Sequence, residues 1–456
     1  MNTGFTSMLG GAAFALLIGS AGVAHAGPDK EDAGGFSIEG SVRVRGEALE
    51  GQVRPNAAES DAMLSFRTLI LARYDFGGVH VVGEIDDARG YGQDVRSTTS
   101  SADINSLEPI QAYLGIELGQ IAGQKGKGLL RLGRFTFESG SGRLIERSDA
   151  SNSPVTFLGV NFDWSSARGD RVHVYLTQPF ERLPTAAADL RDNKFELDRT
   201  SPGLRLGGVS FTRAKLVAGA NAEVFGIWLD EKDSVGRATR DRNLFTFGGR
   251  LNRVPAKGKF DFDVDGAVQH GTTRASTSGS DVTDRRVRAG MVHAELGYTF
   301  PKGWTPRVAL LLDYASGDTP EAAYHRFDPL FGSRRGDFGP NGLYGPLSRS
   351  NIVSPGIAIE GKPYKAWDFS IKARKLWLAS ATDSFGATNV RDASGATGRD
   401  AGAQVEGRVR YWAVPKRVRV EAGAAWLAKG DFLTTAPNAP ATGDMRFGYL
   451  AVTTSF

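Results

Sequence analysis

Apolar and polar residues alternate along much of the chain. In residues 36–48, apolar side chains or glycine fall at every second position, and serine, arginine and glutamate occupy the positions between them. The same alternation returns in residues 62–76 and 260–270. A β-strand directs successive side chains to opposite faces, whereas a helix repeats its apolar positions about every three to four residues. The pattern therefore predicts strands with one apolar and one polar face.

Along the whole chain, this alternation predicts about eighteen strands, each roughly as long as a tilted strand that crosses a membrane. Alternation is weakest in two of them, 203–213 and 350–360. The predicted strands are 36–48, 62–76, 79–88, 107–118, 128–137, 154–164, 170–178, 203–213, 218–230, 243–253, 259–271, 287–300, 305–315, 350–360, 366–378, 402–412, 417–428 and 445–456.

Short and long connections alternate between these strands. Short ones such as 77–78, 214–217 and 361–365 are each followed by a long one, of which the longest is 316–349. Transmembrane β-barrels have this arrangement because their periplasmic turns are tight and their extracellular loops are long. We therefore predict an all-β fold: an antiparallel transmembrane barrel with an even strand number and both termini on the short-turn side.

The two ends of the chain fit an exported barrel. Residues 1–26 contain a short apolar run and end in Ala24-His25-Ala26, which is typical of a signal peptide cleaved after Ala26; an N-terminal hydrophobic anchor is the alternative. Residues 27–456 would then form a single outer-membrane barrel domain. The last predicted strand ends at the C-terminal Phe456, as the closing strands of bacterial outer-membrane barrels do.

The amino-acid composition excludes several kinds of functional site. The chain has no Cys, so disulfides, thiolate metal sites and a Cys nucleophile are excluded. Its His residues lack metal-ligand spacing, and no nucleophile elbow or phosphate loop is present. A pair such as Asp318 and His325 at the rim is the best alternative for a hydrolase, but nothing local specifies it. We predict no enzyme, no cofactor, no metal and no nucleic-acid partner.

Charged residues on the polar faces would line the lumen. Lys and Arg total 55, and most of them are Arg, which can bind a carboxylate through two parallel hydrogen bonds. Such a series would let an anion move between several weak sites, although mutual pairing with lumen acids is the alternative. The candidate substrate-path residues are Arg43, Arg45, Arg67, Arg73, Arg131, Arg134, Arg250, Arg374, Arg408, Arg410, Arg419, Asp86 and Asp313, and the alternation adds Arg205, Arg307 and Lys372.

Three features of the sequence allow more than one interpretation. Arg134 shares the alternation phase of Leu130 and Leu132, so phase alone places it on the apolar face. The acidic residues of 261–265 would hold calcium or, with so many Arg, pair with guanidinium groups. The loop 317–349 either folds over or into the pore or remains a solvated outer loop.

Several short motifs resemble those of the alginate export family of outer-membrane barrels, and they occur in order over nearly the whole chain. The resemblance implies a monomeric eighteen-stranded pore that passes an anionic polysaccharide outward. The motifs lie at 111–114 (QAYL), 133–134 (GR), 142–145 (GRLI), 265–271 (DGAVQHG), 314–318 (YASGD), 327–331 (FDPLF) and 430–432 (GDF), together with Phe456.

The sequence therefore predicts a bacterial outer-membrane channel for anionic polysaccharide or sugar-acid solutes. An uptake porin for small anionic or sugar solutes is the alternative, and a hydrolase active at the rim of the barrel is a third, less favoured hypothesis. Expected partners are outer-membrane lipid, the barrel assembly machinery and, for export of a polymer, periplasmic proteins.

Overall fold

The computed structural model describes residues 35–121, 123–234, 236–333 and 335–456. The predicted signal peptide, residues 1–26, lies outside this part of the chain. Within the described ranges, no helix is both long and apolar enough to cross a membrane.

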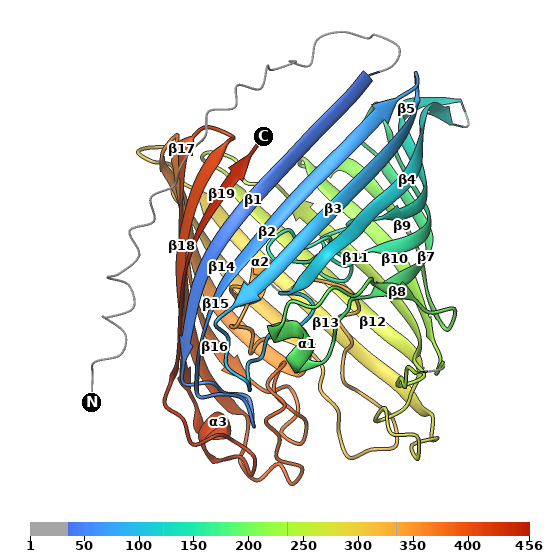
Figure 1. Cartoon of the computed structure of the whole chain (residues 1–456). Helices are drawn as coiled ribbons and strands as arrows, with labels where there is room; N and C mark the ends of the chain where they lie inside the picture. Colours follow the sequence, from blue (N-terminus) through green and yellow to red (C-terminus); the bar gives the residue numbers. More distant parts are fainter. Residues whose placement is uncertain (1–34, 122, 235, 334) are drawn as a thin grey trace. The chain divides into compact units, whose positions relative to one another are not determined.

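The described chain forms one closed antiparallel barrel (Figure 1). Each strand pairs with its neighbours in sequence, and β1 pairs with β19 to close the sheet. The sheet has 19 strands. The two-residue β8 pairs only with the end of β7, and β7 pairs directly with β9. The wall of the barrel is therefore formed by 18 strands. The strands are β1 Gly35–Glu50, β2 Ser60–Asp75, β3 Val79–Tyr91, β4 Asn105–Ile121, β5 Gln124–Phe135, β6 Phe157–Ser166, β7 Arg171–Glu181, β8 Arg199–Thr200, β9 Leu204–Val217, β10 Ala220–Glu231, β11 Asn243–Arg253, β12 Phe260–Thr273, β13 Arg285–Thr299, β14 Arg307–Ala315, β15 Ile352–Tyr364, β16 Trp367–Trp377, β17 Asp400–Val414, β18 Val418–Lys429 and β19 Met445–Ser455.

The predicted fold class is confirmed, including the weakly alternating strands that became β9 and β15. Short turns such as 218–219, 365–366 and 415–417 lie at the end of the barrel that carries the C-terminus (Figure 1). Long loops lie at the other end. They contain three short helices: α1 Ala187–Arg191, α2 Arg335–Phe338 and α3 Asp431–Thr435. In outer-membrane barrels the short turns face the periplasm.

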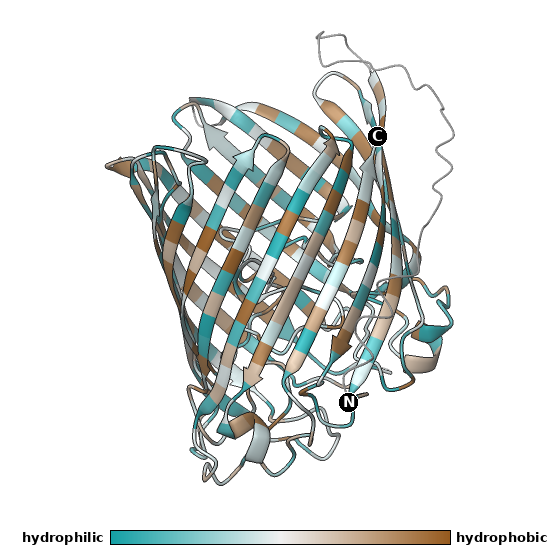
Figure 2. Cartoon of the chain, turned by 90° about the vertical axis from the view of Figure 1, so that its left-hand side faces the viewer, coloured by the Kyte–Doolittle hydropathy of each residue, from teal (hydrophilic) through white to brown (hydrophobic). Residues whose placement is uncertain are grey.

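The outer face of the wall is apolar. Hydrophobic and hydrophilic residues alternate along most strands (Figure 2), and the exposed large apolar side chains belong to the outward positions. Phe36, Val224 and Leu310 are 64%, 63% and 59% exposed, which would be unfavourable in water but is favourable against lipid. The exposed apolar residues form a belt around the barrel. Aromatic pairs such as Phe260 with Tyr298 and Trp367 with Tyr411 lie at its short-turn end, where aromatic residues are expected at the membrane interface.

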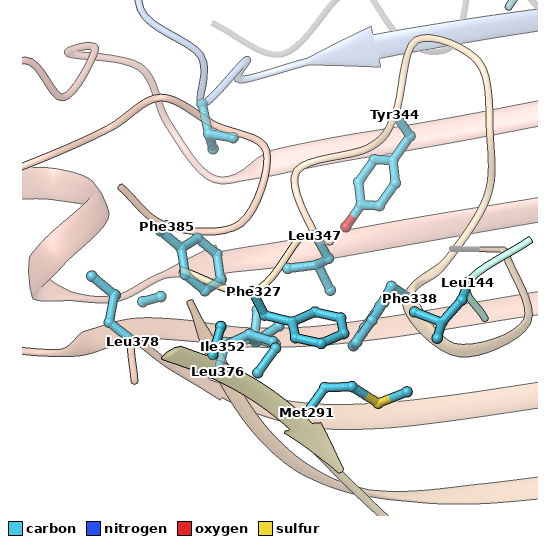
Figure 3. Close-up of a cluster of buried hydrophobic side chains, with 14 of the residues drawn as sticks. Leu144, Met291, Phe327, Phe338, Tyr344, Leu347, Ile352, Leu376, Leu378 and Phe385 are labelled. Atoms are coloured by element: carbon cyan, nitrogen blue, oxygen red, sulfur yellow. The ribbon is translucent and has the colours of Figure 1, made fainter. Parts of the chain in front are cut away.

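The barrel interior is filled at its loop end. Two long loops, 136–156 after β5 and 316–351 after β14, enter the barrel; we call them inner loop A and inner loop B. Both contribute to one apolar cluster together with inward residues of the strands (Figure 3). Its buried members include Leu144, Met291, Phe327, Phe338, Tyr344, Leu347, Ile352, Leu376, Leu378 and Phe385. The core of this protein therefore lies inside the barrel, and it fixes the position of both loops.

Candidate solute path through the barrel

The two inner loops meet across the lumen. Ile145 of inner loop A and Phe331 of inner loop B form a parallel bridge, with the Phe331 amide donating to the Leu144 carbonyl at 3.0 Å. Arg143 of loop A donates to Asp337 of loop B at 3.0 Å. Loop B, which the sequence left as either an outer loop or a pore loop, thus lies in the pore. The junction therefore lies within the lumen.

Arg43 and Arg67 hold inner loop A against β1 and β2. Both guanidinium groups donate to the backbone carbonyls of Asp149 and Ser151, at distances from 2.8 to 3.2 Å. Burial would raise the pKa of the Asp149 carboxyl, but Arg147, Arg67 and Arg43 outweigh it and keep that pKa below its usual range. The loop is therefore fixed by charge-assisted hydrogen bonds to the wall.

Arg45 does the same for inner loop B. Its guanidinium donates to the carbonyl of Asn341 at 2.8 Å and lies over the ring of Tyr449 at 4.1 Å. Glu47, two residues along β1, accepts from the amide of Leu343 at 3.2 Å. Three predicted lumen arginines thus position loops, a role that the strand pattern could not indicate.

The wall formed by β11 to β16 carries compensated charge. Arg374 donates to Asp313 at 2.7 Å, and Nδ1 of His293 lies 2.7 Å from the other carboxylate oxygen of Asp313. All three side chains are nearly inaccessible to solvent. On the same wall, Arg250 binds Asp263 through two hydrogen bonds of 2.6 and 3.0 Å.

The acidic run on β12 is paired with arginine throughout. Arg307 contacts Asp261, Arg250 binds Asp263, and Arg143 reaches Asp265 at 3.3 Å. The structure therefore favours the guanidinium pairing of 261–265 over a calcium site.

Asp86 lies on the opposite wall, on β3. It is completely buried near Arg67 and Arg43, and its carboxylate oxygens have no hydrogen-bond partner among the described residues. A buried, unsatisfied carboxylate is rare in proteins. Asp86 and the two arginines together therefore make a charged patch behind inner loop A.

The remaining lumen arginines lie toward the short-turn end. Arg73 binds Asp75, with its closest contact at 2.6 Å. Arg410 donates to Asp368 at 2.7 Å, and Arg408 lies 3.9 Å from the same carboxylate.

Two arginines differ from all of these. Arg131 donates to the amide oxygen of Asn161 at 3.2 Å and lies 5.9 Å from the ring of Tyr113. Arg419 lies 5.6 Å from the ring of Trp412. Within the described ranges, neither forms an ion pair with a carboxylate.

Arg134 does not belong to the lumen. It lies on the opposite face of β5 from Arg131, beside its cross-strand neighbour Leu158, which is exposed on the outer face. Its guanidinium contacts Glu108 and donates to Asp198 at 3.1 Å, within a buried network under the long loop that follows β7. The alternation phase was therefore right, and its inclusion in the substrate path was wrong. Burial raises the pKa of Asp198 to about 6, with Glu108 adding to the shift.

Arg205 also faces outward. It shares a face of β9 with Val209, which is 52% exposed, while Leu204 and Leu206 point inward into the apolar cluster. The inward face of β9 is apolar here because the barrel core lies at the loop end. This reversal explains why the alternation was weak and the assignment of Arg205 wrong.

Sequence reasoning missed the loop arginines. Arg143, Arg147 and Arg349 have no strand phase, although Arg143 belongs to the 142–145 motif. Arg147 donates to Glu84 at 2.7 and 2.9 Å, and the paired carboxylates keep the pKa of Arg147 raised against the effect of its burial. Arg147 and Arg143 thus link inner loop A to opposite walls, on β3 and β12, whereas Arg349 contacts Asp337 within inner loop B.

Among the described residues, two groups of His and carboxylate side chains are compact enough to share an ion. They are His293, Asp313 and Asp337, and Asp75, His80 and Glu117. In each, arginine already contacts the carboxylates, so the donor sets do not favour a cation. At the rim, Asp318 binds Arg285 at 2.9 Å and accepts from the amide of His325. The Asp318 carboxylate, which the sequence offered with His325 for a hydrolase, is thus engaged in an ion pair with Arg285.

A cavity of about 840 Å³ opens at the short-turn end along β2 to β7. Its lining includes Arg73, Lys127, Arg131 and His173 on the strands, together with residues of inner loop A from Thr136 to Gly140. A smaller cavity of about 140 Å³ lies near the loop end, beside Tyr324 and Asp328.

Comparison with known proteins agrees with this architecture. The alginate export family model matches residues 36–447. No curated protein matches the chain. Among solved structures, OccK3 (OpdO) of Pseudomonas aeruginosa is similar at 14% identity and a TM-score of 0.53, covering 92% of this chain and 95% of that one.

Two further structures are similar at the level of the fold. OccAB1 of Acinetobacter baumannii has a TM-score of 0.57 at 13% identity, with 92% of this chain and 96% of that chain covered. OccK2 (OpdF) of Pseudomonas aeruginosa, in complex with glucuronate, has a TM-score of 0.55 at 12% identity, with 92% and 96% covered. The chain thus belongs to the alginate export family and is an outer-membrane channel for solutes.

Proposed function

We propose that the channel passes anionic sugar acids, as monomers or as short polymers, along a lumen lined by arginine. The observation that carries this proposal is the state of Arg131 and Arg419, which face the lumen and contact aromatic rings in place of carboxylates. A guanidinium without an acidic partner can exchange its hydration for a solute carboxylate. No covalent step is involved.

The family and one similar structure support the class of solute. Alginate is a polymer of uronic acids, and the OccK2 structure contains glucuronate, a single uronic acid. Both carry one carboxylate on a ring that is rich in hydroxyl groups. Arg43, Arg67 and Arg45 add positive charge beside the inner loops, where a passing carboxylate would be attracted.

A second candidate, uptake of small sugar acids, is favoured by the junction of the inner loops. The bridge between Ile145 and Phe331 and the contact between Arg143 and Asp337 span the lumen, which suits a monomer better than a polymer. The direction of flow through a passive channel follows the gradient or a partner. Export of a polymer would need the loops to separate and a periplasmic protein to deliver the chain.

We also propose a cellular setting for the barrel, namely the bacterial outer membrane. The apolar belt would be surrounded by outer-membrane lipid, insertion would use the barrel assembly machinery, and the barrel would act as a monomer after removal of residues 1–26.

Single-channel recording in a planar bilayer tests this function. Under a salt gradient, we expect the reversal potential to show anion selectivity, and oligouronate should block the current while a neutral oligosaccharide of the same length does not. Block by glucuronate but not by longer oligomers would favour uptake over polymer export. A cation-selective channel, or equal block by both oligosaccharides, would contradict the proposal.

A further inference from the structure

The large cavity at the short-turn end has the position of an entry site. Its lining comes from the parts of β2 to β7 next to the short turns, such as Arg73 on β2, Glu117 on β4 and Arg171 on β7. Thr136, Phe137, Glu138 and Gly140 of inner loop A also line it. Because the short turns of outer-membrane barrels face the periplasm, a solute that enters from there meets this cavity before it meets the junction of the loops.

The charges in the cavity divide into paired and unpaired groups. Arg171 is paired with Asp163 at 2.5 Å, and Arg73 is paired with Asp75 and Glu117. Lys127 and Arg131 line the same cavity on one face of β5, and in the described part of the chain neither has a carboxylate within ion-pair distance. Two positive charges are therefore available to an anion, and the carboxyl of Glu138 in inner loop A lines the same cavity.

Arg131 is held in position by neighbouring strands. Asn161, its cross-strand partner on β6, accepts from Arg131 at 3.2 Å and lies 2.7 Å from Nε2 of His173 on β7. The Asn161 and His173 side chains are almost fully buried, and Phe137 packs against the His173 ring. This arrangement aims a planar cation into the cavity without neutralising it, which is what recognition of a carboxylate requires.

The rest of the lining suits a hydroxyl-rich ring. Beside the two cations, Ser165 and Glu138 are not buried and bring a hydroxyl and a carboxyl group to the lining, both of which can hydrogen-bond to sugar hydroxyl groups. The volume falls within the range of about 300–1,000 Å³ that is typical of small-molecule sites. A ligand with one carboxylate and several hydroxyl groups on each ring, namely a uronate or a short oligouronate, matches this combination.

We propose that this cavity is a periplasm-facing capture site for a uronate carboxylate, with Arg131 as the main anchor and Lys127 at its mouth. This inference rests on the proposed function and adds a specific place and a side to it. Binding here would concentrate the solute below the loop junction before it passes.

Side-resolved block of single channels tests the site. Because the chain has no Cys, Ser280→Cys in an exposed long loop gives one thiol whose labelling reports the orientation of each inserted channel. With oligouronate on the short-turn side, we expect Arg131→Gln to weaken block at least about tenfold, and Lys127→Gln to weaken it less. Arg131→Lys should restore part of the affinity because the charge returns without the planar fork.

Lys302→Gln serves as the matched control. Lys302 is exposed in a short turn at the same end but does not line the cavity, so it removes one positive charge without changing the site. Its block should equal that of the wild type. Each variant is first checked for the open-channel conductance of a folded barrel.

The outcomes separate the two proposals. Wild-type block that Arg131→Gln and Lys127→Gln leave unchanged, or block of equal affinity from both sides, would overturn the capture site while the proposed function stands. Absence of oligouronate block from either side in the wild type would overturn the proposed function itself.

Discussion

Two walls of the same lumen use arginine in opposite ways. Between β11 and β16, Arg250, Arg307 and Arg374 each bind at least one carboxylate, so a neighbouring negative charge compensates each positive charge. On β5 and β18, Arg131 and Arg419 lie beside aromatic rings, and neither has a carboxylate partner among the described residues. Under the proposed function, selectivity would depend on the partners of the lumen arginines and not on their number.

The largest effect is expected on the compensated wall. Asp313→Ala would leave Arg374 as a buried, uncompensated cation, and breaking a buried pair in this way typically costs about 3–5 kcal/mol. Urea unfolding of the barrel in lipid measures the loss. Asp75→Ala is the control, because its pair with Arg73 is partly exposed and should contribute only about 0–1 kcal/mol. Equal losses at the two sites would remove the distinction between the walls.

The second effect concerns selectivity. Arg131→Glu combined with Arg419→Glu should shift the reversal potential toward cations, because both charges are uncompensated. A charge-conserving exchange on the other wall, Arg250→Gln with Asp263→Asn, should leave the reversal potential near the wild-type value, because Arg143, which also binds Asp263, keeps Asp265 and Asp337 as partners. If the exchange changed selectivity as much as the double reversal, local pairing would not be the deciding feature.

The third effect concerns the inner loops. Arg43→Ala combined with Arg67→Ala removes four hydrogen bonds to the backbone of inner loop A, each from a charged donor and thus each contributing about 1.5–3 kcal/mol. We expect larger and noisier single-channel currents as the loop leaves the lumen. Arg410→Ala, which removes a charge without touching the loops, should not increase the noise.

The smallest effect is a pH dependence at the proposed capture site. Glu138, in inner loop A, lines the cavity, and burial raises its pKa above the usual glutamate value despite Arg171 and Arg250. On acidification this carboxyl takes up a proton earlier than an ordinary glutamate, so the cavity loses a negative charge. Oligouronate block should therefore strengthen between pH 7 and pH 5, and Glu138→Gln should remove most of that change. Block that weakens on acidification would contradict this assignment.

The sequence by itself determined the wall of this protein. Strand phase depends on neighbouring residues alone, so the alternation placed Arg43, Arg250 and Arg410 on the inner face correctly and even contradicted the inclusion of Arg134. Phase failed at Arg205 because the apolar core inside the barrel made the inward face of β9 apolar as well.

Only the tertiary structure decided which charges are cancelled and what fills the lumen. The contact between Arg143 and Asp337 joins residues 194 positions apart, and the one between Arg45 and Asn341 joins residues 296 positions apart. Loops have no periodicity, so no local pattern could place inner loops A and B within the barrel. Their position depends on long-range burial of side chains such as Phe338 and on hydrogen bonds to the walls, which exist only once the barrel has closed.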